Sequence, residues 1–241
     1  MLKFHICLCL MIFCWQQLPA QDKSSRQVTD SYAADYMDVA SGYAALFSGV
    51  RQQPLLQSLL NHQYFKEQEY FNGRLSCHGV VYPNIPIRWD LYRDELIILS
   101  PNNYNIALKS ESIDFAEIYG YHIFYLYPDN LPGCPPAGNY IRLHSGDDYL
   151  LLEKLTNTMY RDESVQNKRY NYYFDLTTEF YLLKNGEYYK ITNRRTLLKT
   201  LETHRKELRR FIGAHNLRYK RDAEKMALEV VKEHERLSRY E

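Results

Sequence analysis

The chain has 241 residues, of which 45% are hydrophobic and 15% aromatic, and it carries 30 Lys and Arg against 29 Asp and Glu. This composition is typical of a folded globular protein and excludes a disordered or fibrous chain. The even charge balance argues against nucleic acid as a partner, because phosphate neutralisation needs an excess of Lys and Arg. Tyrosine is abundant, at 23 residues. It favours half-buried strand positions where the ring packs and the hydroxyl stays in water, so we expect a β-rich domain.

Residues 1–20 have the order of regions found in a secretory signal peptide. Lys3 and His5 stand beside an apolar run over residues 6–15, and polar and small residues follow as far as Ala20. A helix needs about 20 apolar residues to cross a bilayer, so this shorter run is not expected to stay as an anchor. We predict cleavage after Ala20 and no stable membrane anchor in the mature chain.

Two cysteines, Cys77 and Cys134, remain after that cleavage. An even count in an exported protein predicts a disulfide between them, with a stabilisation of roughly 4 kcal/mol in the chain-entropy model. The alternative is a nucleophilic thiol at Cys77 beside His78. Adjacent residues on a strand point to opposite faces, so the disulfide is the preferred interpretation.

The mature chain divides into a flexible lead-in over residues 21–31 and a single β-rich domain over residues 32–241. We expect an irregular segment with one short helix near residues 55–60, and an exposed polar stretch over residues 156–169. Alternating runs separated by turn residues, such as Arg93-Asp94 and Asn185-Gly186, predict about nine strands. These runs are residues 70–91, 95–99, 104–108, 113–118, 121–127, 140–144, 149–155, 172–183 and 188–192.

After residue 193 the period of the apolar residues becomes helical, which predicts two helices, over residues 194–212 and 222–238. The predicted fold class is therefore α+β and mainly β. It is an antiparallel up-and-down meander sheet, open or barrel-like, followed by a C-terminal helical pair.

Charge is distributed unevenly along the chain. Residues 193–241 hold 14 Lys and Arg against 8 Asp and Glu, whereas residues 21–192 hold 15 against 21. The preferred interpretation is a solvated helix face with pairs such as Glu202 and Lys206 at i, i+4. Contact of the basic helices with an anionic partner, such as a lipid surface or an acidic protein, is the alternative.

Few residues have the spacing of a known catalytic or metal site. The local signatures of serine hydrolases, zinc peptidases and nucleotide-binding loops are missing, and the histidines are scattered singly. No cofactor and no metal are therefore expected. The one carboxylate pair that could act as acid and base is Asp90 with Asp94, which bracket Leu91-Tyr92-Arg93. A hairpin corner, in which each carboxylate bonds nearby backbone, explains this pair more simply.

Tyrosines form the second candidate site. Tyr121, Tyr125 and Tyr127 recur at period two in one run, and Tyr188 lies in a cluster near the last hairpin. Such a set could bind a sugar ring, although ordinary aromatic packing in a sheet would give the same pattern.

A series of short motifs lies between residues 45 and 99. They are Phe47-Ser48-Gly49, His62-Gln63-Tyr64-Phe65, Asn72-Gly73, Gly79 with Tyr82, Trp89-Asp90 and Asp94-Glu95-Leu96. In this combination the chain resembles an uncharacterised family of secreted and periplasmic proteins of Bacteroidota, from which Ser48 and Trp89 depart. The Ala20-Gln21 junction is also similar to signal cleavage sites of that phylum. The resemblance implies an exported β-rich protein, periplasmic or at the cell surface of a Gram-negative bacterium, and implies no substrate.

Two functional hypotheses follow. The first is a non-catalytic binding or interaction module of the cell envelope, whose partner is an envelope ligand or protein. The second is a carboxylate-dependent hydrolase acting on an envelope or glycan substrate, which requires Asp90 or Asp94 to lie in a cleft with a perturbed pKa.

Overall fold

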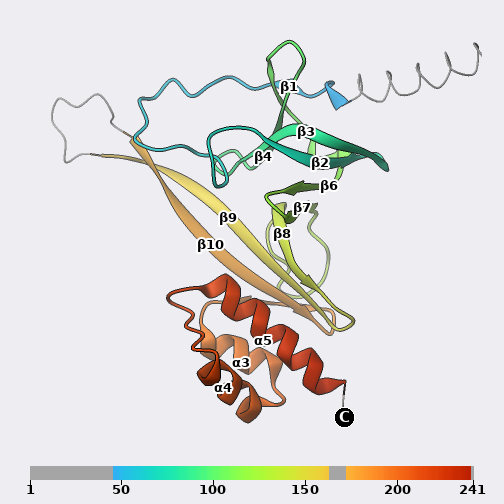
Figure 1. Ribbon diagram of the computed structural model, residues 1–241, viewed down its shortest axis with the longest axis vertical. Helices are drawn as coiled ribbons and strands as arrows, with labels where there is room; N and C mark the ends of the chain where they lie inside the picture. Colours follow the sequence, from blue (N-terminus) through green and yellow to red (C-terminus); the bar gives the residue numbers. More distant parts are fainter. Residues whose placement is uncertain (1–45, 163–171, 240–241) are drawn as a thin grey trace, which may run out of the picture. The chain divides into compact units, whose positions relative to one another are not determined.

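A computed structural model describes residues 46–162 and 172–239. These residues form an antiparallel sheet in the strand order β1-β5-β4-β3-β2-β6-β7-β8-β9-β10-β11, and helices follow it at the C-terminal end (Figure 1). The predicted fold class is thus confirmed: the protein is mainly β, and its sheet is an up-and-down meander that stays open between the edge strands β1 and β11. The expected signal peptide and lead-in lie outside the described residues.

The strands are β1 (Val50–Arg51), β2 (Phe71–Cys77), β3 (Val80–Asp90), β4 (Glu95–Leu99), β5 (Asn105–Ala107), β6 (Ile113–Ile118), β7 (Tyr121–Leu126), β8 (Gly138–Ser145), β9 (Tyr149–Arg161), β10 (Tyr172–Lys184) and β11 (Glu187–Ile191). The helices are the short 3-10 turn η2 (Ser110–Ser112), α3 (Arg194–Leu201), α4 (Arg205–Ala214) and α5 (Ala223–Ser238).

The strand count exceeds the predicted nine for two reasons. The run over residues 70–91 contains a hairpin, because His78 and Gly79 adopt positive φ angles of 51° and 77° and reverse the chain between β2 and β3. The two-residue strand β1 pairs with β5 inside the segment that was expected to be irregular. Both additions are antiparallel, but only the β2–β3 hairpin is local, since β1 pairs with a strand that is distant in sequence.

One local prediction is wrong. No helix forms near residues 55–60, because that segment runs beside β10, where the Leu60 amide donates to the Tyr172 carbonyl at 2.8 Å.

A second prediction, the exposed polar stretch over residues 156–169, is correct for the exposure of Thr156, Thr158 and Tyr160, while residues 163–169 lie outside the described residues. This stretch begins as strand, since β9 continues to Arg161 and pairs with β10 along its whole length. A polar strand is stable here because its ladder partners are supplied by the neighbouring strand.

The predicted helix over residues 194–212 is two helices, α3 and α4, with a corner between them. Glu202 and His204 take positive φ angles of 63° and 50°, which end α3 and start α4. The corner is held by side chains from other elements, because Lys184 Nζ donates to the Thr200 carbonyl at 3.0 Å and Thr203 Oγ1 lies 2.8 Å from Nε2 of His234. The predicted Glu202–Lys206 pair is therefore wrong, and Glu202 instead pairs with Lys184 at 3.2 Å.

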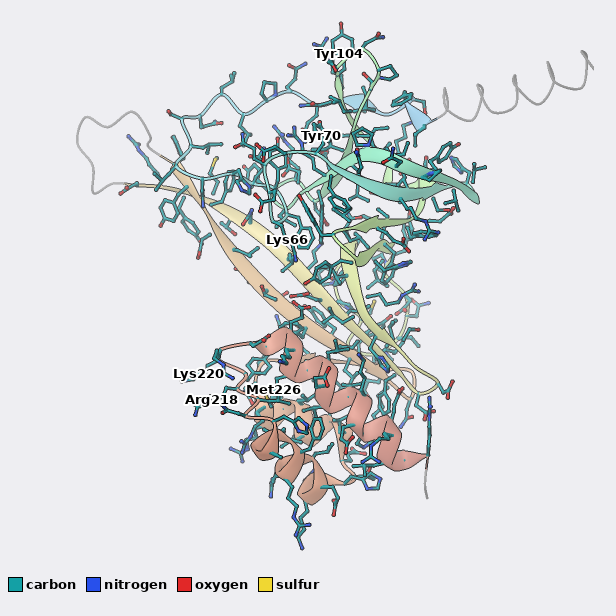
Figure 2. All side chains as sticks on the ribbon, viewed as in Figure 1. Lys66, Tyr70, Tyr104, Arg218, Lys220 and Met226 are labelled. Atoms are coloured by element: carbon teal, nitrogen blue, oxygen red, sulfur yellow. The ribbon has the colours of Figure 1, made fainter. Side chains whose placement is uncertain are left out.

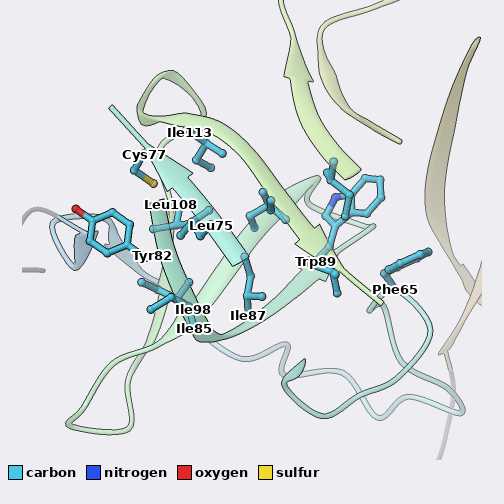
Figure 3. Packing of buried hydrophobic residues seen from close by; sticks show 14 of the residues in the cluster. Phe65, Leu75, Cys77, Tyr82, Ile85, Ile87, Trp89, Ile98, Leu108 and Ile113 are labelled. Carbon is cyan, nitrogen blue, oxygen red and sulfur yellow. The ribbon is translucent and has the colours of Figure 1, made fainter. Parts of the chain in front are cut away.

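Most of the first hydrophobic core comes from strands β2 to β8, and Leu155 of β9 and Phe65 from the segment before β2 also belong to it (Figure 3). Leu75, Ile87 and Trp89 are fully buried in it. Each fully buried aliphatic side chain of this kind contributes about 1.5–3 kcal/mol relative to exposure. Phe65 packs on Trp89 with ring centroids 5.6 Å apart, which fixes the segment before β2 against the sheet.

Two further hydrophobic cores lie on opposite faces of β9. Leu151 packs with α3, α4 and α5 in the second core, while Leu152, its neighbour on the opposite face, packs with Tyr140, Tyr181 and Tyr188 in the third. Leu155 shares the face of Leu151 but belongs to the first core. The same face of β9 therefore contacts the helices at Leu151 and the first core at Leu155.

Candidate functional site

Asp90 is a structural residue in the turn between β3 and β4. Its Oδ1 accepts the backbone amides of Tyr92 and Arg93, each at 3.0 Å, and its Oδ2 accepts Gln52 Nε2 at 3.1 Å. The Arg93 guanidinium lies 3.4 Å from Oδ2. Asp90 is fully buried. Both oxygens are thus occupied by the protein itself, in the corner arrangement that the sequence favours.

Asp94 closes the same turn and ties it to two distant strands. Its Oδ2 lies 2.5 Å from Lys154 Nζ on β9 and accepts the Asn139 amide of β8 at 3.0 Å. Its Oδ1 accepts the indole N–H of Trp89 at 3.1 Å. Asp90 and Asp94 therefore do not converge as an acid–base pair on an open cleft, and each completes a separate hydrogen-bond network.

The four candidate tyrosines do not form one surface. Tyr121 packs against Phe65 with ring centroids 5.5 Å apart, and Tyr125 and Tyr127 contact each other at 4.8 Å. Tyr188 is buried in the third core. Only the Tyr125–Tyr127 pair offers an exposed ring, since Tyr127 is 53% exposed.

The predicted disulfide is wrong, because Cys77 and Cys134 are free thiols. Cys77 is buried in the first core, whereas Cys134 packs against the third core. These cores lie on opposite faces of β8, where Ile141 belongs to the first and Tyr140 to the third, so the sheet separates the two sulfur atoms. Burial, helped by Asp114, raises the pKa of the Cys77 thiol to about 11, which also opposes a nucleophilic role.

A cluster of cations in α3 and α4 forms the clearest candidate site. The two helices enclose a cleft of about 550 Å³ beneath which Leu198 lies. The other lining residues are Arg194, Arg195, Lys199, Arg205 and Arg209. No carboxylate lines the cleft, and within the described residues none of these five cations forms an ion pair with Asp or Glu.

Local structure fixes where these cations lie. Asn193 caps α3 through a reciprocal pair of hydrogen bonds with Thr196, which sets Arg194 and Arg195 in the first turn. At the other end of α3, Arg205 Nε donates to the Leu198 carbonyl at 3.1 Å. That bond satisfies a terminal carbonyl of α3 and holds the start of α4 against it.

The charges at the start of α3 oppose its own backbone dipole. The first turn contains Arg194 and Arg195 and no acidic residue. A cation at a helix N-terminus is unfavourable by about 0.3–1 kcal/mol, because the free amides already carry partial positive charge. These arginines therefore do not stabilise α3, whereas an anion bound in the cleft would be attracted both to them and to the amides.

Glu153 has the largest pKa shift among the carboxylic acids of residues 46–162 and 172–239. It is only 5% exposed on β9, between Leu151 of the second core and Leu155 of the first. Burial, reinforced by the charge of Glu224 and opposed by Lys66, raises the pKa of Glu153 to about 8. The carboxyl is therefore mostly protonated at neutral pH.

Lys66, whose charge lowers the pKa of Glu153, lies on the segment before β2 and is labelled in Figure 2. Its backbone has a φ of 59°, and its ammonium lies 4.3 Å from the centroid of the Tyr121 ring. The Tyr121 hydroxyl donates to Glu224 Oε1 at 3.3 Å. This group of side chains joins the sheet, α5 and the segment before β2.

Sequence reasoning recognised the positive charge of residues 193–241 but not the cleft that gathers it. The available signal was Arg194-Arg195 directly after the capping residue Asn193, where acidic residues are expected. Glu153 was missed as well, although a lone acid after Leu150-Leu151-Leu152 breaks an apolar run.

No cluster of three or more His, Cys, Asp or Glu in residues 46–162 and 172–239 could hold a metal ion. Among the helices described, none is long and apolar enough to span a bilayer.

No family model, curated protein or solved structure matches the chain. The resemblance to secreted proteins of Bacteroidota therefore stays a prediction.

Proposed function

We propose that this chain is a non-catalytic binding module of the cell envelope that takes a compact, multiply charged anion in the cleft between α3 and α4. The observation that carries the proposal is the lining of that cleft, which has five cations and no carboxylate. The signal-like features of residues 1–20 support the envelope as its location.

The residue types favour a phosphate-bearing ligand. Four of the five cations are arginines, whose planar guanidinium groups hold phosphate oxygens in pairs. A ligand with more than one phosphate matches the number of cations better than a single carboxylate does.

The rest of the chain favours a small anion over an extended polymer. Residues 21–192 carry 15 Lys and Arg against 21 Asp and Glu. Their net negative charge would repel the part of a long polyanion that extends beyond the cleft. This charge distribution agrees with the expectation that nucleic acid is not the partner.

The hydrolase hypothesis has less support. The oxygens of Asp90 and Asp94 are engaged by backbone amides, Lys154 and Trp89, which leaves neither carboxylate open to a substrate. We therefore expect any anion bound in the α3–α4 cleft to be released unchanged.

Calorimetric titration with tripolyphosphate, pyrophosphate and inorganic phosphate tests the proposal. Affinity should rise with the number of phosphates and fall with salt, because counterions compete for the same cations. Arg209→Glu should weaken tripolyphosphate binding by about tenfold or more, since it removes one cation and adds a repulsive charge.

The matched control is Arg210→Glu, on the same helix. Arg210 is also exposed but does not line the cleft, so both variants change the net charge equally. A second control, Arg218→Glu, alters a cation on the exposed loop before α5 (Figure 2). If all three variants weaken binding equally, the attraction is a general charge effect and the proposed cleft is not the site.

A further inference from the structure

A second cavity lies between residues 61–66 and the β9–β10 hairpin, away from the basic cleft. Its volume is about 330 Å³, at the lower end of the range for small-molecule sites. Its apolar lining comes from Phe65, Leu91, Leu155, Phe174 and Leu176. This composition suits a ligand with an apolar body about the size of one substituted ring.

The walls of this cavity are fixed by hydrogen bonds within the protein. The Asn61 side chain donates to the Phe174 carbonyl at 2.8 Å and accepts the Phe174 amide at 2.7 Å. On the other side, Asn157 Nδ2 and the Leu91 amide both donate to the Gln63 carbonyl, at 3.1 and 2.9 Å. The cavity is therefore preformed, and binding need not include the free-energy cost of ordering its walls.

The side chain of Leu176 lines the cavity and is left exposed to water by the fold. It lies opposite Asn157 in the β9–β10 ladder and is 53% exposed, whereas Leu155 and Phe174 in the same cavity are buried. A ring placed against Leu176 removes this surface from water, which is the main source of affinity in a small apolar site.

Lys66 supplies the only permanently charged side chain among the lining residues. Its ammonium lies 5.6 Å from the Phe65 ring centroid and forms no ion pair with any described carboxylate. Two acids lie nearby: Glu153 is mostly protonated at neutral pH, and Glu224 accepts the Tyr121 hydroxyl and forms no ion pair with Lys66. One positive charge beside an apolar cavity matches a ligand with one negative charge.

The aromatic residues narrow the ligand class further. Phe65, Phe174 and Tyr64 all line the cavity, and aromatic side chains pack well against another ring in edge or offset contact. We propose that this cavity is a binding site for a small aromatic carboxylate, whose ring contacts Leu176 and whose carboxylate pairs with Lys66. This site is independent of the anion site in the α3–α4 cleft.

Calorimetry with 4-phenylbutanoate and its neutral amide tests the assignment. The acid should bind saturably, and the amide should bind about tenfold more weakly because it lacks the charge that pairs with Lys66. Lys66→Gln should remove the preference for the acid, and Leu176→Ser should weaken both ligands. Both side chains are exposed, so the variants should stay folded, which urea unfolding of each variant checks.

Leu56→Ser is the matched control for Leu176→Ser, because Leu56 is 95% exposed and does not line the cavity. It should leave binding unchanged. Failure of the acid to bind, equal affinity for acid and amide, or an unchanged preference in Lys66→Gln would each overturn the assignment. Arg209→Glu should not alter 4-phenylbutanoate binding, which keeps this result separate from the test of the α3–α4 cleft.

Discussion

The turn between β3 and β4 and the cleft between α3 and α4 both concentrate charged side chains within a short length of chain, yet they treat those charges differently. In the turn, Asp90 and Asp94 have both oxygens engaged by donors from the protein. In the cleft, the cations that line it have no acidic partner among the described residues. Charge that the fold neutralises is structural, whereas charge that it leaves uncompensated is available to a ligand.

Substitutions of charged residues should lower the free energy of unfolding in the β3–β4 turn more than in the α3–α4 cleft. Removing a satisfied carboxylate from the turn leaves buried donors without acceptors, which destabilises the protein. Removing the charge of a cleft cation other than Arg205 should cost the fold little, because these cations form no ion pair among the described residues, whereas the Arg205 guanidinium donates to the Leu198 carbonyl.

Glu153 should make the protein lose stability as the pH rises. Its pKa is about 8 in the folded protein against 4.5 for the ordinary group, so the folded state holds the proton more tightly than the unfolded state does. The free energy of unfolding should therefore decrease between pH 4.5 and 8, by roughly 5 kcal/mol in total, and become level above pH 8. Urea unfolding measured across this pH range gives the slope.

Glu153→Gln is the matched variant, because an amide has the shape of the protonated acid and does not titrate. It should equal the wild type near pH 4.5 and exceed it increasingly up to pH 8. Glu224→Gln should lower the folded pKa of Glu153, since the charge of Glu224 is the second cause that raises it. Parallel pH profiles for the wild type and Glu153→Gln would show that Glu153 does not titrate in this range.

Asp94→Ala should destabilise the protein by about 3 kcal/mol. The substitution leaves Lys154 without its partner, and the side chain of Lys154 is only 10% exposed. It also removes the acceptor of the Trp89 indole. Urea unfolding at pH 7 measures the loss.

Asp94→Asn keeps an oxygen for one of these donors and should lose less stability than the alanine variant. Tyr92→Ala, in the same turn, changes an exposed ring and leaves the Asp94 contacts in place. A loss below about 1 kcal/mol for Asp94→Ala would mean that the network contributes no more than exposed ion pairs do.

The turn could be predicted from sequence because its chemistry is local. Asp90 bonds amides two and three residues ahead, and Asn185-Gly186 forms its hairpin with positive φ at both residues. Such interactions depend on residue order alone. The alternation of apolar residues likewise predicted most strands and the antiparallel pairing of neighbours in sequence, but not the β2–β6 and β1–β5 pairings.

The remaining features depend on contacts between distant residues. The corner that divides α3 from α4 is held by Lys184 and His234, which lie on other elements. The side of the sheet on which each cysteine falls depends on strand register. The cation cleft needs that corner, so charge counting alone could find the basic region but not the site.

Arg195→Glu should increase stability slightly while it weakens anion binding. The substitution places a negative charge in the first turn of α3, where the backbone amides favour it, and a gain of about 0.5 kcal/mol is expected. Arg210→Glu, outside the cleft and far from a helix N-terminus, should give no such gain. Paired urea unfolding and tripolyphosphate titration of the two variants measure both effects. If Arg195→Glu instead loses stability, Arg195 serves the fold, and the distinction between structural and available charge does not hold for this helix.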